Sequence, residues 1–200
     1  MGVDDVQRAL LEYEPSLLEA GLRQRAAVAI VLTDNAGSLD LLLIERARRA
    51  GDPWSGQMAF PGGRVDAADA TARAAAERET LEEVGLSLAG SEFLGRLDDL
   101  PGRPVPPSEF AVSAFVFYTR DPGVLALNHE VQDAFWFPLD SLSDRERHID
   151  HPAKVESGRL FPGILVGEPG RHVVWGLTYR FLDRFLKILG QPLPEWTPGS

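Results

Sequence analysis

The chain has 200 residues, of which 44% are hydrophobic, and its 20 basic and 30 acidic side chains give a net charge of −10. Such a chain is long enough for one enzyme-sized domain, and its acidic balance argues against a general nucleic-acid-binding or acidic-membrane surface. It contains no cysteine, which excludes disulfides and thiol chemistry.

The first part of the chain predicts helix followed by paired strands. Residues 3–22 carry spaced apolar side chains that Pro15 interrupts, which favours one or two short helices capping the domain. The aliphatic runs 26–32 and 39–44 are separated by the turn signal Asp-Asn-Ala-Gly at 34–37. These runs are therefore predicted to pair as a hairpin.

Two glycines and two arginines that follow are candidate substrate-binding residues. Gly62 and Gly63 lack side chains, so the backbone there can approach an anion or a metal closely. Arg46 and Arg64 would supply local positive charge to an anionic substrate. Local charge is needed because the net charge of the chain is negative.

The next helix carries a group of carboxylates on one face. Glu79, Glu82 and Glu83 stand at i, i+3 and i+4, and each such like-charge pair weakens an isolated helix by about 0.2–0.5 kcal/mol. A divalent cation would remove this repulsion. Oxygen ligands without neighbouring His or Cys suit Mg²⁺ or Mn²⁺. We expect Glu79 and Glu83, about one turn apart, as the first ligands, and Glu82 as a ligand of a second metal or as a supporting residue.

The flanks of this helix support the assignment. Arg78 can hold one carboxylate in place while the others face the metal. Asp69 is a plausible N-cap, and Gly85 supplies a left-handed C-terminal stop. An apolar stripe on the opposite side is expected to pack onto a sheet: Ala74, Leu81 and Val84.

The remaining elements complete an α/β pattern. Strands are predicted at 92–97, 110–118 and 134–139, and an amphipathic helix at 177–189. The proline-rich loop 101–107 is expected to border the site. Because strands and helices alternate irregularly, we expect a mixed sheet sandwiched between helices.

The segments 60–63, Phe-Pro-Gly-Gly, and 78–86 together resemble the signature of the Nudix hydrolases. Eight of the nine residues from 78 to 86 agree with that signature, and only Thr80 stands where an aliphatic residue is usual. The preceding loop is one residue longer than the commonest spacing. A shift by one residue brings Gly63 and Asp69 to the expected glycine and acidic positions.

The longer loop resembles the coenzyme A pyrophosphatase branch of this family. That branch carries an upstream stretch to which residues 42–49 and the Gly-Gln-Met-Ala run 56–59 are similar. Residues 51–55, Gly-Asp-Pro-Trp-Ser, depart from it, with one extra residue and without the usual arginine and histidine.

The resemblance implies a Nudix-type α/β/α sandwich and a Mg²⁺- or Mn²⁺-dependent pyrophosphohydrolase. The implied substrate is coenzyme A or a related nucleoside-diphosphate derivative. Arg78 and Glu82 are then expected in the catalytic machinery. Glu130, in a run similar to the Asn-x-Glu-Val of that branch, is the candidate general base, and Glu109 is its competitor.

Two alternatives remain open. One is a non-catalytic Nudix ligand-sensing module, and the other is a Nudix hydrolase of nucleoside triphosphates, ADP-sugars or dinucleotides.

We expect an N-terminal helical cap at 1–24, a Nudix domain at 25–190 and a tail at 191–200. Without an apolar signal core or an 18-residue apolar run, a cytoplasmic protein is expected. We expect no nucleic-acid or membrane partner, and a homodimer is possible.

Overall fold

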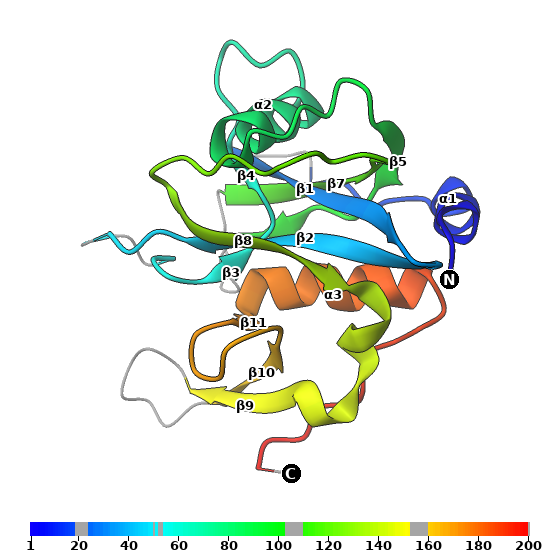
Figure 1. Ribbon diagram of the computed structural model, residues 1–200, viewed down its shortest axis with the longest axis vertical. Coiled ribbons are helices and arrows are strands. Elements are labelled where there is room, and N and C mark those ends of the chain that lie inside the picture. Colours follow the sequence, from blue (N-terminus) through cyan, green and yellow to red (C-terminus); the bar gives the residue numbers. More distant parts are fainter. Residues whose placement is uncertain (19–23, 50, 52–53, 103–109, 153–159, 200) are drawn as a thin grey trace.

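The structure, a computed structural model, describes residues 1–18, 24–49, 51, 54–102, 110–152 and 160–199 (Figure 1). Its main sheet has eight strands, with a central order β3-β2-β1-β7-β5. These five are β1 (Gln24–Asn35), β2 (Ser38–Arg46), β3 (Met58–Ala59), β5 (Glu92–Arg96) and β7 (Phe110–Tyr118). The others are β4 (Gly62–Arg64) on β1, β6 (Leu100–Pro101) on β7 and β8 (Val131–Pro138) on β2.

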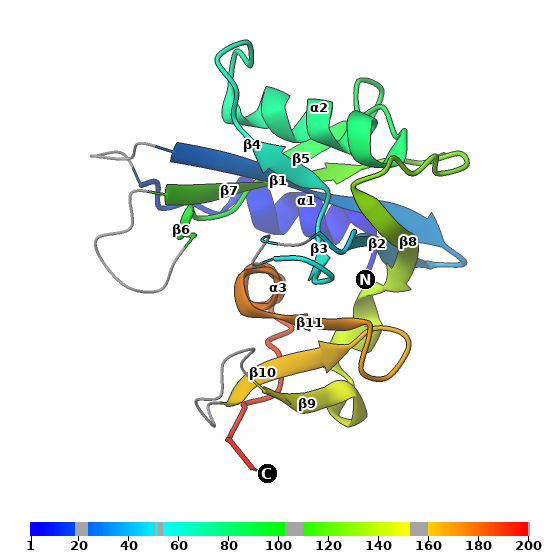
Figure 2. The same cartoon turned by 90° about the vertical axis from the view of Figure 1, so that its left-hand side faces the viewer.

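The sheet is mixed and lies between helices. β1 and β7 run parallel, whereas β2 pairs antiparallel with both β1 and β8. Helix α2 (Ala72–Val84) covers one face and α3 (Gly176–Ile188) lies against the other, as the two views show (Figures 1 and 2). Helix α1 (Val3–Leu11) packs beside β5. This arrangement confirms the predicted α/β sandwich with a mixed sheet.

Alternation along the central strands builds one core on each face of the sheet. In β1, Ala27, Ala29 and Val31 pack towards α2, whereas Ile30 and Leu32 pack towards α3. All five side chains are buried. Because successive side chains of a strand point to opposite faces, an uninterrupted aliphatic run supplies both cores.

A second, three-stranded sheet lies beyond α3 from the main sheet (Figure 2). It consists of β9 (His148–Pro152), β10 (Leu160–Leu165) and β11 (Val173–Trp175), and two 3₁₀ helices, Leu139–Ser143 and Arg145–Arg147, lead into it. β9 and β10 were not predicted from the sequence, since both are short, β9 mixes polar with apolar residues, and Pro162 and Gly163 interrupt the apolar run of β10. β11 runs directly into α3.

The N-terminal segment has one helix among its described residues. Residues 12–18 after α1 are irregular, so a second short helix is not present in the part of the segment that the structure describes. Asp98 holds this segment by accepting the Tyr13 hydroxyl at 2.6 Å and the Ser16 N–H at 2.7 Å. None of the helices in the described ranges is both long and apolar enough to cross a membrane.

Candidate active site

Helix α2 begins at Thr71, whose hydroxyl accepts the Ala74 N–H at 3.1 Å. The expectation that Asp69 is the N-cap is therefore wrong. Gly85 ends the helix with a φ of 71° and donates its N–H to the Leu81 carbonyl at 3.0 Å. This left-handed stop was predicted, because a residue with a Cβ is strained in that conformation.

The buried side of α2 differs from the predicted stripe. Leu81 is 51% exposed, so it does not pack onto the sheet. Val84 is buried as predicted, whereas Ala74 is only partly buried, and Ala75, Ala76 and the fully buried Thr80 complete the face that packs onto the sheet. The Thr80 hydroxyl donates to the Ala76 carbonyl at 2.7 Å, which satisfies it in the core and explains how threonine replaces an aliphatic residue there.

Arg78 joins the loop before α2 to the carboxylates on it. Its Nε and Nη2 donate to the two Asp69 oxygens at 3.0 and 2.9 Å. Its Nη1 donates to Glu79 at 2.9 Å and to Glu82 at 3.1 Å, and Nη2 also donates to the Arg64 carbonyl at 3.1 Å. The hydrogen bond to Arg78 is the largest cause that lowers the pKa of Asp69. Arg78 therefore orients carboxylates.

The double glycine brings the backbone against the two innermost carboxylates. The Gly62 N–H donates to Glu83 Oε2 at 2.9 Å. A Cβ on Gly63 would lie 2.4 Å from the Glu79 carboxyl carbon, and one on Gly62 would lie 2.3 Å from the Ala27 carbonyl oxygen. Gly63 therefore lies against Glu79 while Asp69 pairs with Arg78, which are the glycine and the acidic residue selected by the one-residue shift.

Burial and neighbouring negative charges destabilise the ionised forms of Glu79 and Glu83. Glu83 is 2% exposed, and burial is the largest cause that raises its pKa from 4.5 to about 7. Burial also raises the pKa of Glu79. The charge of Glu130 adds to both upward shifts, whereas that of Arg46 lowers the pKa of Glu83. Glu130 and Arg46 are therefore near enough to act electrostatically on Glu83.

The donor set fits a hard divalent cation. Glu79 and Glu83 offer carboxylate oxygens that burial destabilises as anions, and a cation would offset this cost. Glu82 is more peripheral, with a side chain 54% exposed and held by Arg78. Glu109, the other candidate base, lies outside the described residues.

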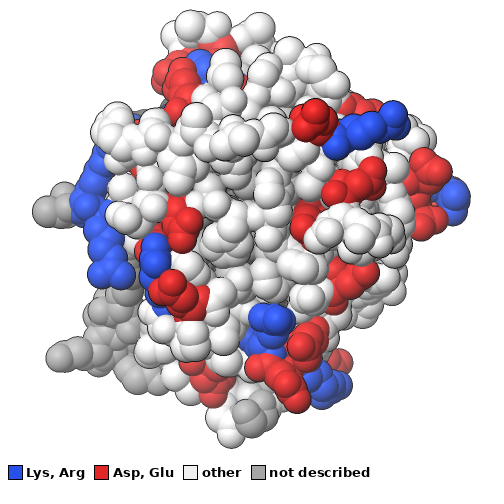
Figure 3. Space-filling view, in the orientation of Figure 1, with Lys and Arg blue, Asp and Glu red and all other residues white. Residues whose placement is uncertain are grey.

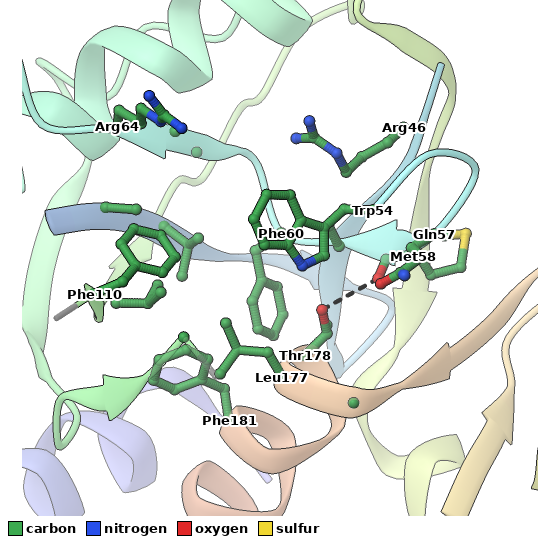
Figure 4. A pocket seen from close by; sticks show the side chains of 18 of the residues that line it. Arg46, Trp54, Gln57, Met58, Phe60, Arg64, Phe110, Leu177, Thr178 and Phe181 are labelled. Carbon is green, nitrogen blue, oxygen red and sulfur yellow. Dashed lines mark hydrogen bonds between the residues drawn. The ribbon is translucent and has the colours of Figure 1, made fainter. Parts of the chain in front are cut away.

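A cavity of about 900 Å³ opens beside the glycines. Arg46 and Arg64 lie at its upper end in Figure 4, and aromatic and aliphatic side chains line the rest. The labelled apolar ones are Trp54, Met58, Phe60, Phe110, Leu177 and Phe181. The Thr178 hydroxyl donates to the Met58 carbonyl at 3.1 Å and ties α3 to β3. The motif segments 56–59 and 60–63 supply part of this lining, and the rest comes from segments far apart in the sequence, which no local motif predicted.

A second group of possible metal ligands lies between β2, β8 and β11. Oxygens of Glu45 and Asp133 and a nitrogen of His172 lie within 4.8 Å of one another. His172 Nδ1, however, accepts the Glu168 N–H at 3.1 Å, so the ring proton of the neutral imidazole is on Nε2, where a metal would need a lone pair. Arg171 also lies 2.7 Å from Glu45 and 3.4 Å from Asp133. These residues form an ion-pair cluster that joins the two sheets.

A comparison with protein-family models shows to which family this α/β chain belongs. The model of the NUDIX domain matches residues 23–157. The chain belongs to the Nudix hydrolase family. As a member it is an enzyme that acts on phosphorus anhydrides, the class predicted from the sequence.

Relatives extend this match over most of the chain. The Nudix hydrolase NudL of Salmonella paratyphi B is 30% identical over 179 residues, which cover 88% of each protein. NudL of Citrobacter koseri is 28% identical over the same length. Protein C14C4.10c of Schizosaccharomyces pombe is 39% identical over 110 residues, 51% of this chain and 32% of that protein. This chain thus spans about a third of the yeast protein.

Solved structures support the fold. A MutT/nudix family protein from Enterococcus faecalis superposes with a TM-score of 0.52 at 20% identity, covering 95% of this chain and 75% of that one. A NUDIX hydrolase from Alicyclobacillus acidocaldarius gives a TM-score of 0.50 at 20% identity, covering 64% and 86%. At this level of identity the likeness concerns the arrangement of strands and helices alone.

Proposed function

We propose that this protein is a divalent-metal-dependent Nudix pyrophosphohydrolase that cleaves the diphosphate linkage of coenzyme A or a related nucleoside-diphosphate derivative. The observation that carries the proposal is the position of Glu79 and Glu83. Both lie against the double glycine, and these glycines also line the large cavity with its two arginines. The proposed anion-binding groups, the proposed metal ligands and space for an organic group therefore lie at one place, which supports the proposal.

Glu79 and Glu83 are the proposed ligands of Mg²⁺ or Mn²⁺, with Glu82 as a further ligand or a support. When bound, the cation neutralises charge on the phosphate oxygens during attack by water. Arg78 keeps its proposed part in catalysis by orienting Glu79 and Glu82. Gly62 fixes one oxygen of Glu83, and the other oxygen is the proposed contact with the cation.

Glu130 is the proposed general base. It accepts a proton from the attacking water as the new P–O bond forms and the P–O bond of the anhydride breaks. The leaving phosphate departs with the electron pair of the broken bond. Cleavage of coenzyme A would yield a phosphopantetheine and an adenosine bisphosphate, with one water consumed.

The cavity favours a substrate that carries an apolar or aromatic arm beside its diphosphate. Arg46 and Arg64 can contact phosphate at one end, whereas Phe110, Leu177 and Phe181 offer only carbon surface at the other (Figure 4). Acidic side chains accompany the basic ones over most of the face in Figure 3, so these two arginines would provide local attraction for an anion. Coenzyme A carries organic groups on both sides of its diphosphate, pantetheine and adenosine, whereas a nucleoside triphosphate carries one, so coenzyme A is the substrate that we propose.

Phosphorus NMR of the protein with Mg²⁺ tests the proposal against coenzyme A, NADH, ADP-ribose and nucleoside triphosphates. Glu83→Gln should abolish turnover, whereas Glu77→Gln, on the same helix but paired with Arg73, should retain it. Cleavage of a different diphosphate would keep the mechanism and discard the substrate. Ligand binding that persists in EDTA, without turnover of any compound, would instead support a sensing module.

A further inference from the structure

The candidate general base is held by an arginine outside the cavity lining. Arg49 Nη1 donates to Glu130 Oε1 at 2.9 Å, and the two side chains are 46% and 41% exposed. The backbone at both ends of this pair is also fixed. The Ala47 N–H donates to the Glu130 carbonyl at 2.8 Å, and the Arg49 N–H donates to the Ser55 hydroxyl at 2.8 Å.

Arg49 restrains the carboxylate of Glu130, whereas another residue restrains the Glu130 main chain. Asn128 Oδ1 accepts the Glu130 N–H at 2.7 Å, which fixes the main chain. The side chain is nevertheless half exposed, and an exposed glutamate without a partner samples several rotamers. His129 lies near the same oxygen, at 4.0 Å, but its side chain is 82% exposed and gives little constraint.

Orientation matters here because Glu130 lies close enough to influence Glu79 and Glu83. The Asn128 N–H, two residues before Glu130, donates to the Glu83 carbonyl at 2.9 Å and so fixes this segment against α2, and the negative charge of Glu130 acts on both carboxylates. A base must be held within hydrogen-bond reach of the water that it deprotonates, and small errors in position are costly in rate. An arginine that restricts the rotamer of Glu130 can thus affect turnover without contact with the reacting atoms.

We propose that Arg49 is a positioning residue for this reaction and that it acts through Glu130, by holding its carboxylate towards the Glu79–Glu83 pair. The inference rests on the proposed function and on the role given there to Glu130. It assigns to Arg49 an effect on turnover rather than on substrate affinity.

Arg48 provides a matched control one residue away. It has the same charge and is also exposed, but its side chain lies over Gly56, where an added Cβ would be 3.4 Å from Arg48 Nε. Substitution of either arginine by glutamine changes the net charge equally. A general electrostatic effect on an anionic substrate would therefore appear in both variants, whereas positioning of Glu130 would appear only in Arg49→Gln.

The test is a double-mutant cycle on Mg²⁺-dependent coenzyme A cleavage, with kcat and KM measured separately. Since a general base contributes at least about a hundredfold, we expect Arg49→Gln to lower kcat by about tenfold with KM nearly unchanged. Glu130→Gln should cost more, and Arg49→Gln should cause no further loss in that background. Arg49→Lys should recover most of the rate, and Arg48→Gln should behave as the wild type.

Several results would overturn the inference. Equal losses from Arg49→Gln with and without Glu130, or a rise in KM at constant kcat, would show direct action on the substrate. An unchanged kcat in Glu130→Gln would remove the base through which Arg49 is said to act. Absence of turnover by the wild-type protein on every diphosphate overturns the proposed function itself, and the role of Arg49 with it, whereas an active wild type with additive losses overturns the role of Arg49 alone.

Discussion

The backbone of Gly63 lies directly against the carboxylate of Glu79. A Cβ at this glycine would be 2.4 Å from the Glu79 carboxyl carbon and 2.5 Å from one of its oxygens. Real Cβ atoms do not approach so closely, so any larger residue must displace the carboxylate or β4. The glycine is required here for space rather than for an unusual backbone conformation, and this gives a sharp test of where the proposed metal is held.

Gly63→Ala should lower kcat for coenzyme A cleavage by about a hundredfold, because displacing a ligand by about 1 Å has effects of that order. The concentration of Mg²⁺ needed for half-maximal activity should rise as well. Gly90→Ala is the control, since an added Cβ there meets nothing within 4 Å. Wild-type kinetics in Gly63→Ala would argue against Glu79 as a ligand.

The raised pKa of Glu83 predicts how the free energy of unfolding of the metal-free protein depends on pH. Burial raises its pKa from 4.5 to about 7 in the folded state, so the folded protein binds this proton more tightly than the unfolded chain does. Its stabilising contribution is fully present below about pH 4.5 and is lost as the pH rises through about 7, with an upper limit of about 3 kcal/mol.

Urea unfolding in EDTA from about pH 5 to about pH 8 measures this effect as a falling free energy of unfolding. Glu83→Gln has no such proton and should flatten the fall. Mg²⁺ should stabilise the wild type more at the upper end of the range, because the ligand is then ionised. An equal slope in wild type and Glu83→Gln would contradict the assignment.

Thr80 replaces an aliphatic residue in the core without an unsatisfied hydroxyl. Its hydroxyl donates to the Ala76 carbonyl, an acceptor in the preceding turn of the same helix, so Thr80→Val should stay within about 1 kcal/mol of wild-type stability. Thr80→Ala should cost about 1 kcal/mol or more, since it removes a buried methyl group. Urea unfolding of both variants checks this, and a large loss in Thr80→Val would show that the hydroxyl itself stabilises the site.

Periodicity and turn chemistry predicted the parts of the fold that depend on local sequence. The hairpin of β1 and β2 follows from two aliphatic runs around a turn, where Gly37 has a φ of 96°. β7 matches its predicted bounds, and α3 differs by one residue at each end. The i, i+3, i+4 carboxylates likewise depend only on helix geometry, and the structure places Glu79 and Glu83 together against β4.

What the sequence did not predict depends on tertiary contacts. A hydrophobicity pattern marks Leu81 as the buried residue of α2, yet Leu81 is 51% exposed and Glu83 is 2% exposed. The acidic side of α2 faces inward. There Glu83 accepts the Gly62 N–H, a contact between residues that are 21 positions apart in the sequence. Asp69 was predicted as the N-cap because local sequence does not reveal its partner, Arg78, which lies nine residues further along the chain.

The cavity wall offers a last test, which separates substrate binding from chemistry. Trp54 lines the cavity, is 40% exposed, and its ring centroid lies 6.5 Å from that of Phe110. Trp54→Ala should raise the KM for coenzyme A by about tenfold, since loss of one aromatic contact of this kind costs about 1–2 kcal/mol. The value of kcat should change little.

Trp196→Phe serves as the control for this variant, because Trp196, in the C-terminal tail, donates to Asp150 of β9 at 2.8 Å and is not among the residues that line the cavity. Steady-state kinetics with coenzyme A and with ADP-ribose distinguish the possibilities. If Trp54 contacts the apolar arm, the KM for coenzyme A rises and that for ADP-ribose rises less. A fall in kcat at unchanged KM would mean that Trp54 supports the catalytic residues, and an equal rise for both substrates would place the nucleoside rather than the arm beneath it.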